Sequence, residues 1–296
     1  IAVITLKKAI LFTDGRYTLQ ARMELNKSWE IHPLLSNNWI DWITDHLSAG
    51  QSIGFDPWLV TASTFQILSE KVKKKDIGIK LDKKNLVDEV WVNRPKIIQK
   101  EPIVWKVNYF AVDAKNKVND LLAEMQFKDI DALIITQPNQ VCWLLNIRGN
   151  NLKYTPSFLG FLVVEKNGNI NIFSQCDIKY IKGNLRNHLF YKLEQYLSKF
   201  GNKNVAVNKK NCPSIIYNKL IHINAKVENG FSFLQEKVTI KNKKEIQHIR
   251  NCHIADGVAL ANFFYWIENN IKKQKITEYD ASEKLKNFRA ENKNFI

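Results

Sequence analysis

Short apolar runs separated by turn residues predict alternating strands and helices over the first 92 positions. Residues 2–4 and 10–12 are apolar, flank a polar turn and predict a β-hairpin. Asp14 follows where a helix N-cap belongs, because its carboxylate can accept a bond from an unpaired N–H of the first turn. Gly15 eases the change of direction. The alternation continues with helical patterns at 16–23, 37–47, 61–72 and 85–91 and a strand pattern at 52–56.

A linker and a second strand–helix series follow. Residues 93–106 carry Pro95 and Pro102 and little periodicity, which predicts the linker. Residues 114–127 then form a helical pattern whose apolar face is Val118, Leu121, Leu122 and Met125. The next expected elements are a buried strand at 131–136, a hairpin at 158–173, a helix at 188–201, a strand at 204–208, a helix at 213–221 and a strand at 225–229. Strands that alternate with helices indicate an α/β fold.

Particular residues fix the expected turns and helix ends of this series. Asn139 is expected to cap a short helix that runs through Trp143. Asn167 and Gly168 are expected to form a type I′ turn between the two strands of the hairpin. Gly201 is placed to stop the helix before it. Pro213 suits the first position of the following helix, since a proline there loses no hydrogen bond.

The last section predicts two long helices with one apolar face each. Asn242 and Glu245 have the spacing of a capping box. The face that follows consists of Ile246, Ile249, His253, Gly257, Leu260, Phe264, Ile267 and Ile271, about seven turns of helix. A glycine within such a face predicts close packing against another element. Thr277 caps a second helix, whose apolar positions are Ala281, Leu285 and Phe288.

Composition narrows the class of protein. The chain has 296 residues, 45% hydrophobic residues and eight tryptophans, enough for a sizeable core. No apolar run approaches the roughly 20 residues of a membrane span, and no signal-peptide pattern is visible. The four cysteines, Cys142, Cys176, Cys212 and Cys252, are far apart, which is typical of reduced thiols and predicts a cytoplasmic protein without membrane association.

The net charge of +15 raises the question of nucleic-acid binding, because 44 Lys and Arg face 29 Asp and Glu. Most of the excess is lysine, scattered in segments such as Lys71–Lys75 and 208–211. No aromatic–basic run of the RNA-binding type is present. We therefore expect a solvated lysine-rich surface and no specific nucleic-acid partner.

The search for catalytic spacing finds none. His253 and Asp256 are three apart on a helix and supply two ligands, whereas zinc or manganese needs three or more; we expect His253 to be a packed core histidine. No serine-nucleophile elbow and no glycine-rich phosphate loop exist. Asp14 and Arg16 are interpreted as a capped strand-to-helix joint, with ligand contact as the alternative.

Several segments, in order along the whole chain, resemble the long, three-domain form of aminopeptidase P, the Xaa-Pro aminopeptidase family. They are "TDGRYTLQA" (13–21), "NLVDEVWVNRP" (85–95), "VCWLLNIRG" (141–149), "KNKKEIQHIRNCHIADGVAL" (241–260) and "ITEYDASEKLKNFR" (276–289). The resemblance implies two creatinase-like α/β domains, at 1–107 (with a linker at about 93–107) and 108–237. The first two helices of a pita-bread catalytic domain then follow at 238–296. It also implies that the start of the first domain and most of the catalytic domain are not in this chain.

In that family two divalent metal ions, typically Mn²⁺, are held by Asp, His and Glu, and a metal-bound hydroxide cleaves the bond before a proline at position 2. No catalytic or metal-binding residue of this chain matches those positions, and its substrate-binding residues are unknown. The resemblance implies no cofactor in this chain, peptide substrates only for the complete enzyme, and allows a homodimer there. Trp143 and Arg148 are interpreted as core packing and an ion pair, with a place at the mouth of the active site as the alternative.

Two functions therefore stand at this point. The first is the N-terminal part of a metal-dependent Xaa-Pro aminopeptidase, inactive by itself. The alternative is a non-catalytic binding module, a pseudo-peptidase or a relative that binds histones or nucleic acid. Peptide hydrolysis and salt-dependent binding separate them.

Overall fold

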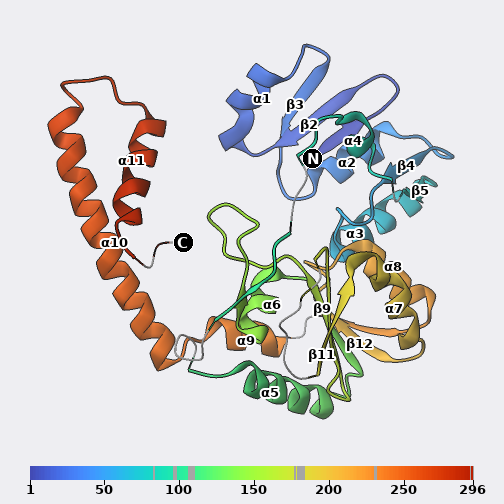
Figure 1. Ribbon diagram of the computed structural model, residues 1–296. Helices are drawn as coiled ribbons and strands as arrows, with labels where there is room; N and C mark the ends of the chain where they lie inside the picture. The colour runs from blue at the N-terminus through green and yellow to red at the C-terminus, as the bar shows by residue number, and fades with distance from the viewer. Residues whose placement is uncertain are drawn as a thin grey trace. The chain divides into compact units, whose positions relative to one another are not determined.

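The computed structural model describes residues 1–82, 84–95, 99–105, 111–176, 178, 184–229, 232–293 and 295. The chain divides into two compact units. Unit 1 consists of Ile1–Lys96, Leu197–Gly201 and Asn208–Val227, and unit 2 of Ile97–Tyr196, Asn202–Val207 and Glu228–Ile296. Figure 1 shows the elements of both units.

Unit 1 contains two small sheets. In the first, β1 (Ala2–Ile4) pairs antiparallel with β2 (Ala9–Thr13), and β2 pairs parallel with β3 (Trp29–Pro33). The predicted N-terminal hairpin is therefore confirmed. In the second, β4 (Ser52–Phe55) and β5 (Gly78–Leu81) are parallel. The helical segments of this unit are η1 (Gly15–Tyr17), α1 (Thr18–Glu24), α2 (Asn38–His46), α3 (Ala62–Lys73), α4 (Leu86–Val90), η4 (Ser198–Phe200) and α8 (Ser214–His222).

The core of unit 1 forms because β2, α2 and α3 each turn an apolar face inward. Ile10 and Phe12 of β2 alternate with more exposed neighbours and meet Ile40 of α2 and Leu68 of α3, all of them at most 2% exposed. By contrast, Leu19 on α1 is exposed.

Segments far apart in the sequence join in unit 1 through α8. Its residue Ser214 donates through Oγ to the carbonyl of Pro57 at 3.0 Å, and Gln66 of α3 donates to the hydroxyl of Tyr217 at 2.9 Å. Pro213 is the N-cap of α8 and not its first helical residue, since its ψ of 141° is extended.

The larger sheet is mixed, with strand order β11-β10-β9-β7-β12-β13, and belongs to unit 2 except for Lys226 and Val227 of β13. Its strands are β7 (Ala132–Ile135), β9 (Phe161–Glu165), β10 (Ile170–Ser174), β11 (Leu185–Leu189), β12 (Asn204–Val207) and β13 (Lys226–Asn229). Strand β9 runs antiparallel to β7 and β10, whereas β7 pairs parallel with β12 and β10 with β11. Strands β7, β10, β11 and β12 are thus parallel to one another, and their C-terminal ends lie at the same end of the sheet.

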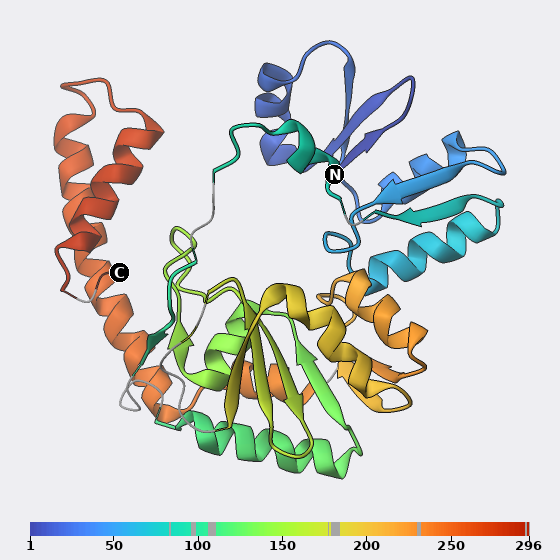
Figure 2. The ribbon, with the colours of Figure 1, turned by 45° about the vertical axis from the view of Figure 1, so that its right-hand side comes forward.

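Helices α5 (Ala114–Phe127), α6 (Pro138–Leu145) and α9 (Ser232–Thr239) contact one another and cover this sheet (Figures 1 and 2). The predicted face of α5 is confirmed: Leu121 and Met125 are fully buried, Val118 nearly so, and Leu122 packs against the same core. Strand β7 is buried at every position, as expected of a strand inside an α/β sheet.

Two local predictions in unit 2, a helix cap and a turn type, are wrong. Helix α6 begins at Pro138, after Gln137, and Asn139 does not cap it. In the β9–β10 hairpin only Gly168 has a positive φ, 88°, so the turn is not type I′. The bond from the Glu165 N–H to the Asn169 carbonyl instead closes a longer loop, in which a glycine in the left-handed region takes up the extra residue.

The helix predicted at 188–201 begins two residues later than expected, at Phe190, and only its middle part is α-helical. His188 and Leu189 belong to β11, and the helical part consists of η3 (Phe190–Lys192), α7 (Leu193–Leu197) and η4. Gly201 has a negative φ of −54°, whereas Asn202 takes the left-handed conformation at 55°. Strand pairing with β10 fixed His188 and Leu189 in extended form, which local helical periodicity does not reveal.

The predicted linker contains structure. Strand β6 (Ile103–Val104) lies within it and pairs antiparallel with β8 (Ile147–Arg148). Positions 96–98 and 106 of that prediction lie outside the described residues. This pairing joins the linker to the segment that follows α6.

The last two helices are α10 (Lys243–Asn270) and α11 (Glu278–Ala290), an antiparallel pair that Figure 2 shows side by side. The predicted capping box of Asn242 with Glu245 is confirmed, and Thr277 caps α11 as predicted, in a capping box with Asp280. At Gly257, however, a Cβ would meet no atom within 4 Å, so the expected close packing is not found in the described residues. Among the described helices, none is both long and apolar enough to cross a membrane.

Candidate functional site

Asp14 and Arg16 form a capped joint on the surface of unit 1. The Asp14 carboxylate accepts from the Arg16 N–H at 2.9 Å and from its Nε at 2.8 Å. These bonds hold the pKa of Asp14 below its ordinary value. Both side chains are largely exposed and satisfy each other. The interpretation as a strand-to-helix joint therefore fits the structure.

His253 and Asp256 do not form a metal site. His253 is exposed, so the expectation of a packed core histidine is wrong. The Asp256 carboxylate accepts from Nε and Nη2 of Arg289 at 2.6 and 3.2 Å, which lowers its pKa. Nowhere in the described ranges do three His, Cys, Asp or Glu side chains gather as metal ligands.

The "WLLNIRG" segment leads to a buried polar cluster in unit 2. Asn146 ends α6 in the left-handed conformation, with φ 53° and ψ 39°, and is 4% exposed. Its Nδ2 donates to the Val112 carbonyl at 3.0 Å, and its own carbonyl accepts from the Trp105 N–H at 3.0 Å. Asn146 thereby connects the start of α5, the end of α6 and the β6 strand region.

Lys117 of α5 completes this cluster, which we call the Asn146 joint (Trp105, Val112, Lys117, Trp143 and Asn146). Its Nζ donates to Oδ1 of Asn146 at 2.7 Å and to the carbonyl of Trp143 at 2.8 Å. It also lies 4.3 Å from the centre of the Trp143 ring, a cation–π contact. Only 5% of Lys117 is exposed, and burial lowers its pKa to about 8.

Arg148 lies beside the joint on β8. Its Nη1 donates to the carbonyls of Ile147 at 2.8 Å and Cys142 at 3.4 Å, and its guanidinium lies over the Trp105 ring at 5.1 Å. Burial lowers its pKa, while Glu245, in the first turn of α10, acts in the opposite direction. These contacts agree with the packing role expected of Trp143 and Arg148.

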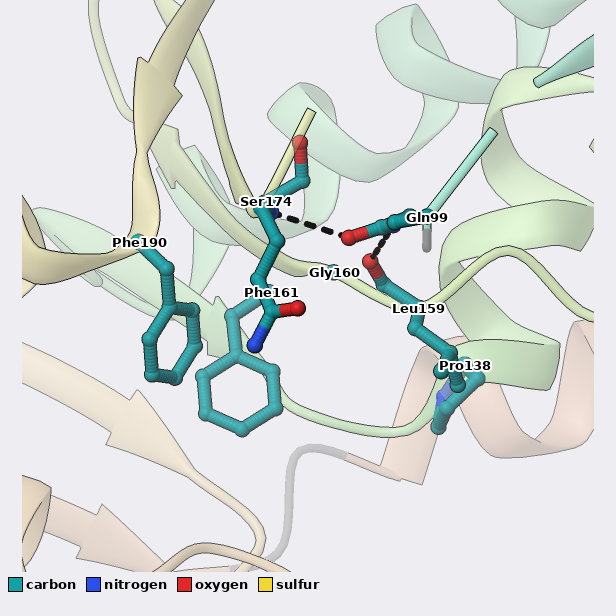
Figure 3. A pocket seen from close by; sticks show the side chains of 8 residues that line it. Gln99, Pro138, Leu159, Gly160, Phe161, Ser174 and Phe190 are labelled. Atoms are coloured by element: carbon teal, nitrogen blue, oxygen red, sulfur yellow. Dashed lines mark hydrogen bonds between the residues drawn. The ribbon is translucent and has the colours of Figure 1, made fainter. Parts of the chain in front are cut away.

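A small apolar cavity of about 190 Å³ lies at the edge where β7, β10 and β11 end. Figure 3 shows the rings of Phe161 and Phe190 next to each other on its wall. The centres of the two rings are 5.3 Å apart, and the angle between the ring planes is 67°. Gln99 closes one side, since it donates to the Leu159 carbonyl and accepts from the Gln175 N–H at 2.9 Å. Ligands of open α/β sheets bind at such an edge. The cavity has room for one apolar group, and the Gln99 amide is already engaged with the protein.

Sequence reasoning missed Lys117, Asn146 and Gln99. One signal was available for Lys117, because it stands next to Val118 on the buried face of α5. A lysine at such a position is buried only when other groups pair with it. Asn146 carried a second signal, because asparagine tolerates the left-handed conformation that ends a helix. Nothing in the sequence around Gln99 pointed to the Leu159 carbonyl.

Comparison with known proteins agrees with this architecture. Two models described as "Creatinase/Prolidase N-terminal domain" match residues 1–86 and 93–245. The chain belongs to this family, whose members include Xaa-Pro aminopeptidases.

The chain is 32% identical over 322 residues to a probable Xaa-Pro aminopeptidase P of Pyrenophora teres f. teres, covering 100% of the chain and 48% of that protein. It is 32% identical over 319 residues to the corresponding protein of Pyrenophora tritici-repentis, covering 100% and 53%. The chain thus spans about half the length of these relatives.

Among solved structures, the X-prolyl aminopeptidase of Caenorhabditis elegans superposes with a TM-score of 0.89 and 26% identity. The match covers 100% of this chain and 51% of that one. That protein is described as a cytosolic enzyme with a di-nuclear active site. The α/β fold with creatinase N-terminal domains is therefore confirmed.

Proposed function

We propose that this chain forms the N-terminal domains of a metal-dependent Xaa-Pro aminopeptidase, which releases the first residue of peptides with proline at position 2. The observation that carries the proposal is the full-length match of this chain to one half of an X-prolyl aminopeptidase. The relatives from Pyrenophora support it. Cytoplasmic location is part of the proposal and rests on the cytosolic description of the nematode enzyme.

In this proposal the chain supplies structure and not the hydrolytic groups. The His253–Asp256 pair does not fit a metal, because Arg289 engages both carboxylate oxygens of Asp256. The Asp14 carboxylate is likewise engaged by Arg16. We assign the two metal ions, of which Mn²⁺ is the expected kind, and the attacking water to residues outside this chain. The role left to the described residues is to hold the two α/β units and the α10–α11 pair in shape.

A chimera tests the proposal. This chain replaces the matching half of the nematode enzyme, and two peptides are offered that differ only in proline or alanine at position 2. We expect Mn²⁺-dependent release of the first residue from the proline peptide, and none from the alanine peptide. A chimera that folds, as judged by circular dichroism, but cleaves neither peptide would contradict the proposal.

The isolated chain is the matched control. Incubated with the proline peptide and excess Mn²⁺, it is expected to release no more of the first residue than a sample with EDTA. Release above that blank would show that a hydrolytic site lies within this chain.

A further inference from the structure

The Asn146 joint places an ammonium group where water hardly reaches it. Lys117 is 5% exposed and Asn146 is 4% exposed, and both lie between α5 and the end of α6. Moving a charged amine out of water costs free energy that hydrogen bonds recover only in part. Two acceptors at 2.7 and 2.8 Å and the Trp143 ring contribute to that recovery.

We propose that the Asn146 joint is a proton-sensitive conformational device, which opens more readily when Lys117 is protonated and tightens when Lys117 is neutral. Opening lets water reach the ammonium and removes the cost of burying it. A neutral amine has no such cost, and it can still donate hydrogen bonds to the Trp143 carbonyl and to Asn146 Oδ1. This inference is independent of the proposed function.

Burial has a larger effect on the pKa of Lys117 than the charged groups around it. Glu245, in the first turn of α10, favours the protonated form, and Arg148 of β8 disfavours it. Helix α6 carries no charged side chain, and burial raises the pKa of its Cys142 thiol, which keeps that thiol neutral. The charged residues of α9, Glu236 and Lys237, are exposed. Burial therefore outweighs Glu245 and holds the pKa of Lys117 near 8.

The joint has consequences for its surroundings because several elements depend on it. The Trp105 N–H bonds the Asn146 carbonyl, and the Asn146 N–H bonds the Cys142 carbonyl at the end of α6. When the joint opens, these two amides exchange with solvent. Their hydrogen exchange therefore reports opening at this place in unit 2.

Linkage gives the size of the effect. In the closed joint Lys117 has a pKa of about 8, and in an open, solvated joint it returns toward its ordinary value of 10.5. The opening equilibrium constant then falls roughly ten-fold between pH 7 and pH 9. The closed joint thus becomes more stable as pH rises, whereas a salt bridge that raises the pKa of a lysine becomes less stable as pH rises.

Hydrogen exchange by NMR tests this on the whole chain between pH 6.5 and 9.5, corrected for the pH dependence of chemical exchange. We expect the opening constants of the Trp105 and Asn146 amides to fall roughly ten-fold from pH 7 to pH 9. Amides of β7, such as that of Leu133, are expected to change much less. In Lys117→Met the dependence disappears, whereas Lys115→Met, an exposed position on the same helix, keeps it.

Three results of the exchange experiment overturn the proposal. They are opening constants that do not change with pH, constants that rise with pH, and the wild-type slope retained in Lys117→Met. If Lys117→Met does not fold, the Cε carbon of Lys117 is titrated by NMR in the unsubstituted chain. A midpoint near pH 8 supports the device, and one near the ordinary 10.5 overturns it.

Discussion

Arg289 of α11 donates two parallel hydrogen bonds to Asp256 of α10, from Nε to Oδ1 at 2.6 Å and from Nη2 to Oδ2 at 3.2 Å. The planar guanidinium and the carboxylate have matching geometry, so two bonds form at once. The pair therefore attracts the two helices to each other and also fixes their register. The pair also explains why Asp256, which the sequence offered as a metal ligand, is engaged elsewhere.

Substitution Arg289→Lys is expected to weaken the α10–α11 pair by roughly 0.5–1 kcal/mol, because an ammonium cannot form both bonds and the site is partly solvated. Urea denaturation followed by circular dichroism measures the loss. Arg250→Lys, an exposed position on α10, is the matched control and should leave the midpoint unchanged. Equal midpoints for Arg289→Lys and the unsubstituted chain would show that the paired hydrogen bonds of Arg289 do not contribute to stability.

The same pair predicts a pH dependence. Arg289 lowers the pKa of Asp256 from its ordinary 3.8, so the stabilisation is fully present above that value and is lost as pH falls through the lowered one. In Arg289→Ala we expect the carboxyl of Asp256 to titrate close to 3.8, measured by NMR. A titration midpoint that does not move would contradict the assignment of the shift to Arg289.

Two glycines should respond to alanine with opposite signs. At Gly149 a Cβ would lie 2.5 Å from the carbonyl oxygen of Ser157 and 2.7 Å from Cα of Phe158, both backbone atoms that cannot easily move. We expect Gly149→Ala to destabilise unit 2 by roughly 1–3 kcal/mol or more. Gly257→Ala meets no atom within 4 Å and should stabilise α10 by about 1 kcal/mol. Denaturant unfolding of both variants decides this.

The apolar face of α10 predicts self-association of the chain. Ile246, Ile249, Phe264 and Ile271 are 38–56% exposed. An exposed apolar stripe of this kind favours association in water. Light scattering should therefore show oligomers or aggregates, and removal of everything after Val238 should yield a more soluble chain in which residues 109–237 stay folded.

A point variant makes this test specific to the face. Phe264→Asp should reduce association, whereas Leu19→Asp, on an exposed position of α1, should not. A clean monomer whose last two helices resist limited proteolysis would mean that the face is already covered, and would contradict this prediction.

Nucleic-acid binding is expected to be weak and strongly salt-dependent. In the lysine-rich segment that raised the question, Lys71 pairs with Asp41 and Lys75 with Asp45, which neutralises part of its charge. Fluorescence anisotropy with a labelled duplex at low and physiological salt measures the affinity. A tight complex that persists at physiological salt would favour the binding-module alternative.

Local chemistry was predictable where the signal lies within one or two turns of chain. The caps at Asp14, Asn242 and Thr277 were predicted because each needs only a side-chain oxygen and the next few N–H groups. The extent of α5 and its buried face followed from the period of its apolar residues. The start of the helix predicted at 188–201 was wrong because β10 pairs with 185–189, and a strand partner elsewhere in the chain does not show in local periodicity.

The order of the amino acids was enough to derive the alternation of strands and helices, the caps and, through its motifs, the family. It could not determine which polar residue would be buried, since that depends on which surfaces meet in space. Tertiary structure alone placed Lys117 against Asn146 and Trp143, residues 29 and 26 positions away, and drew Asp256 to Arg289. A cap is completed by neighbours along the chain, whereas the pKa of a buried amine is fixed by packing between distant elements.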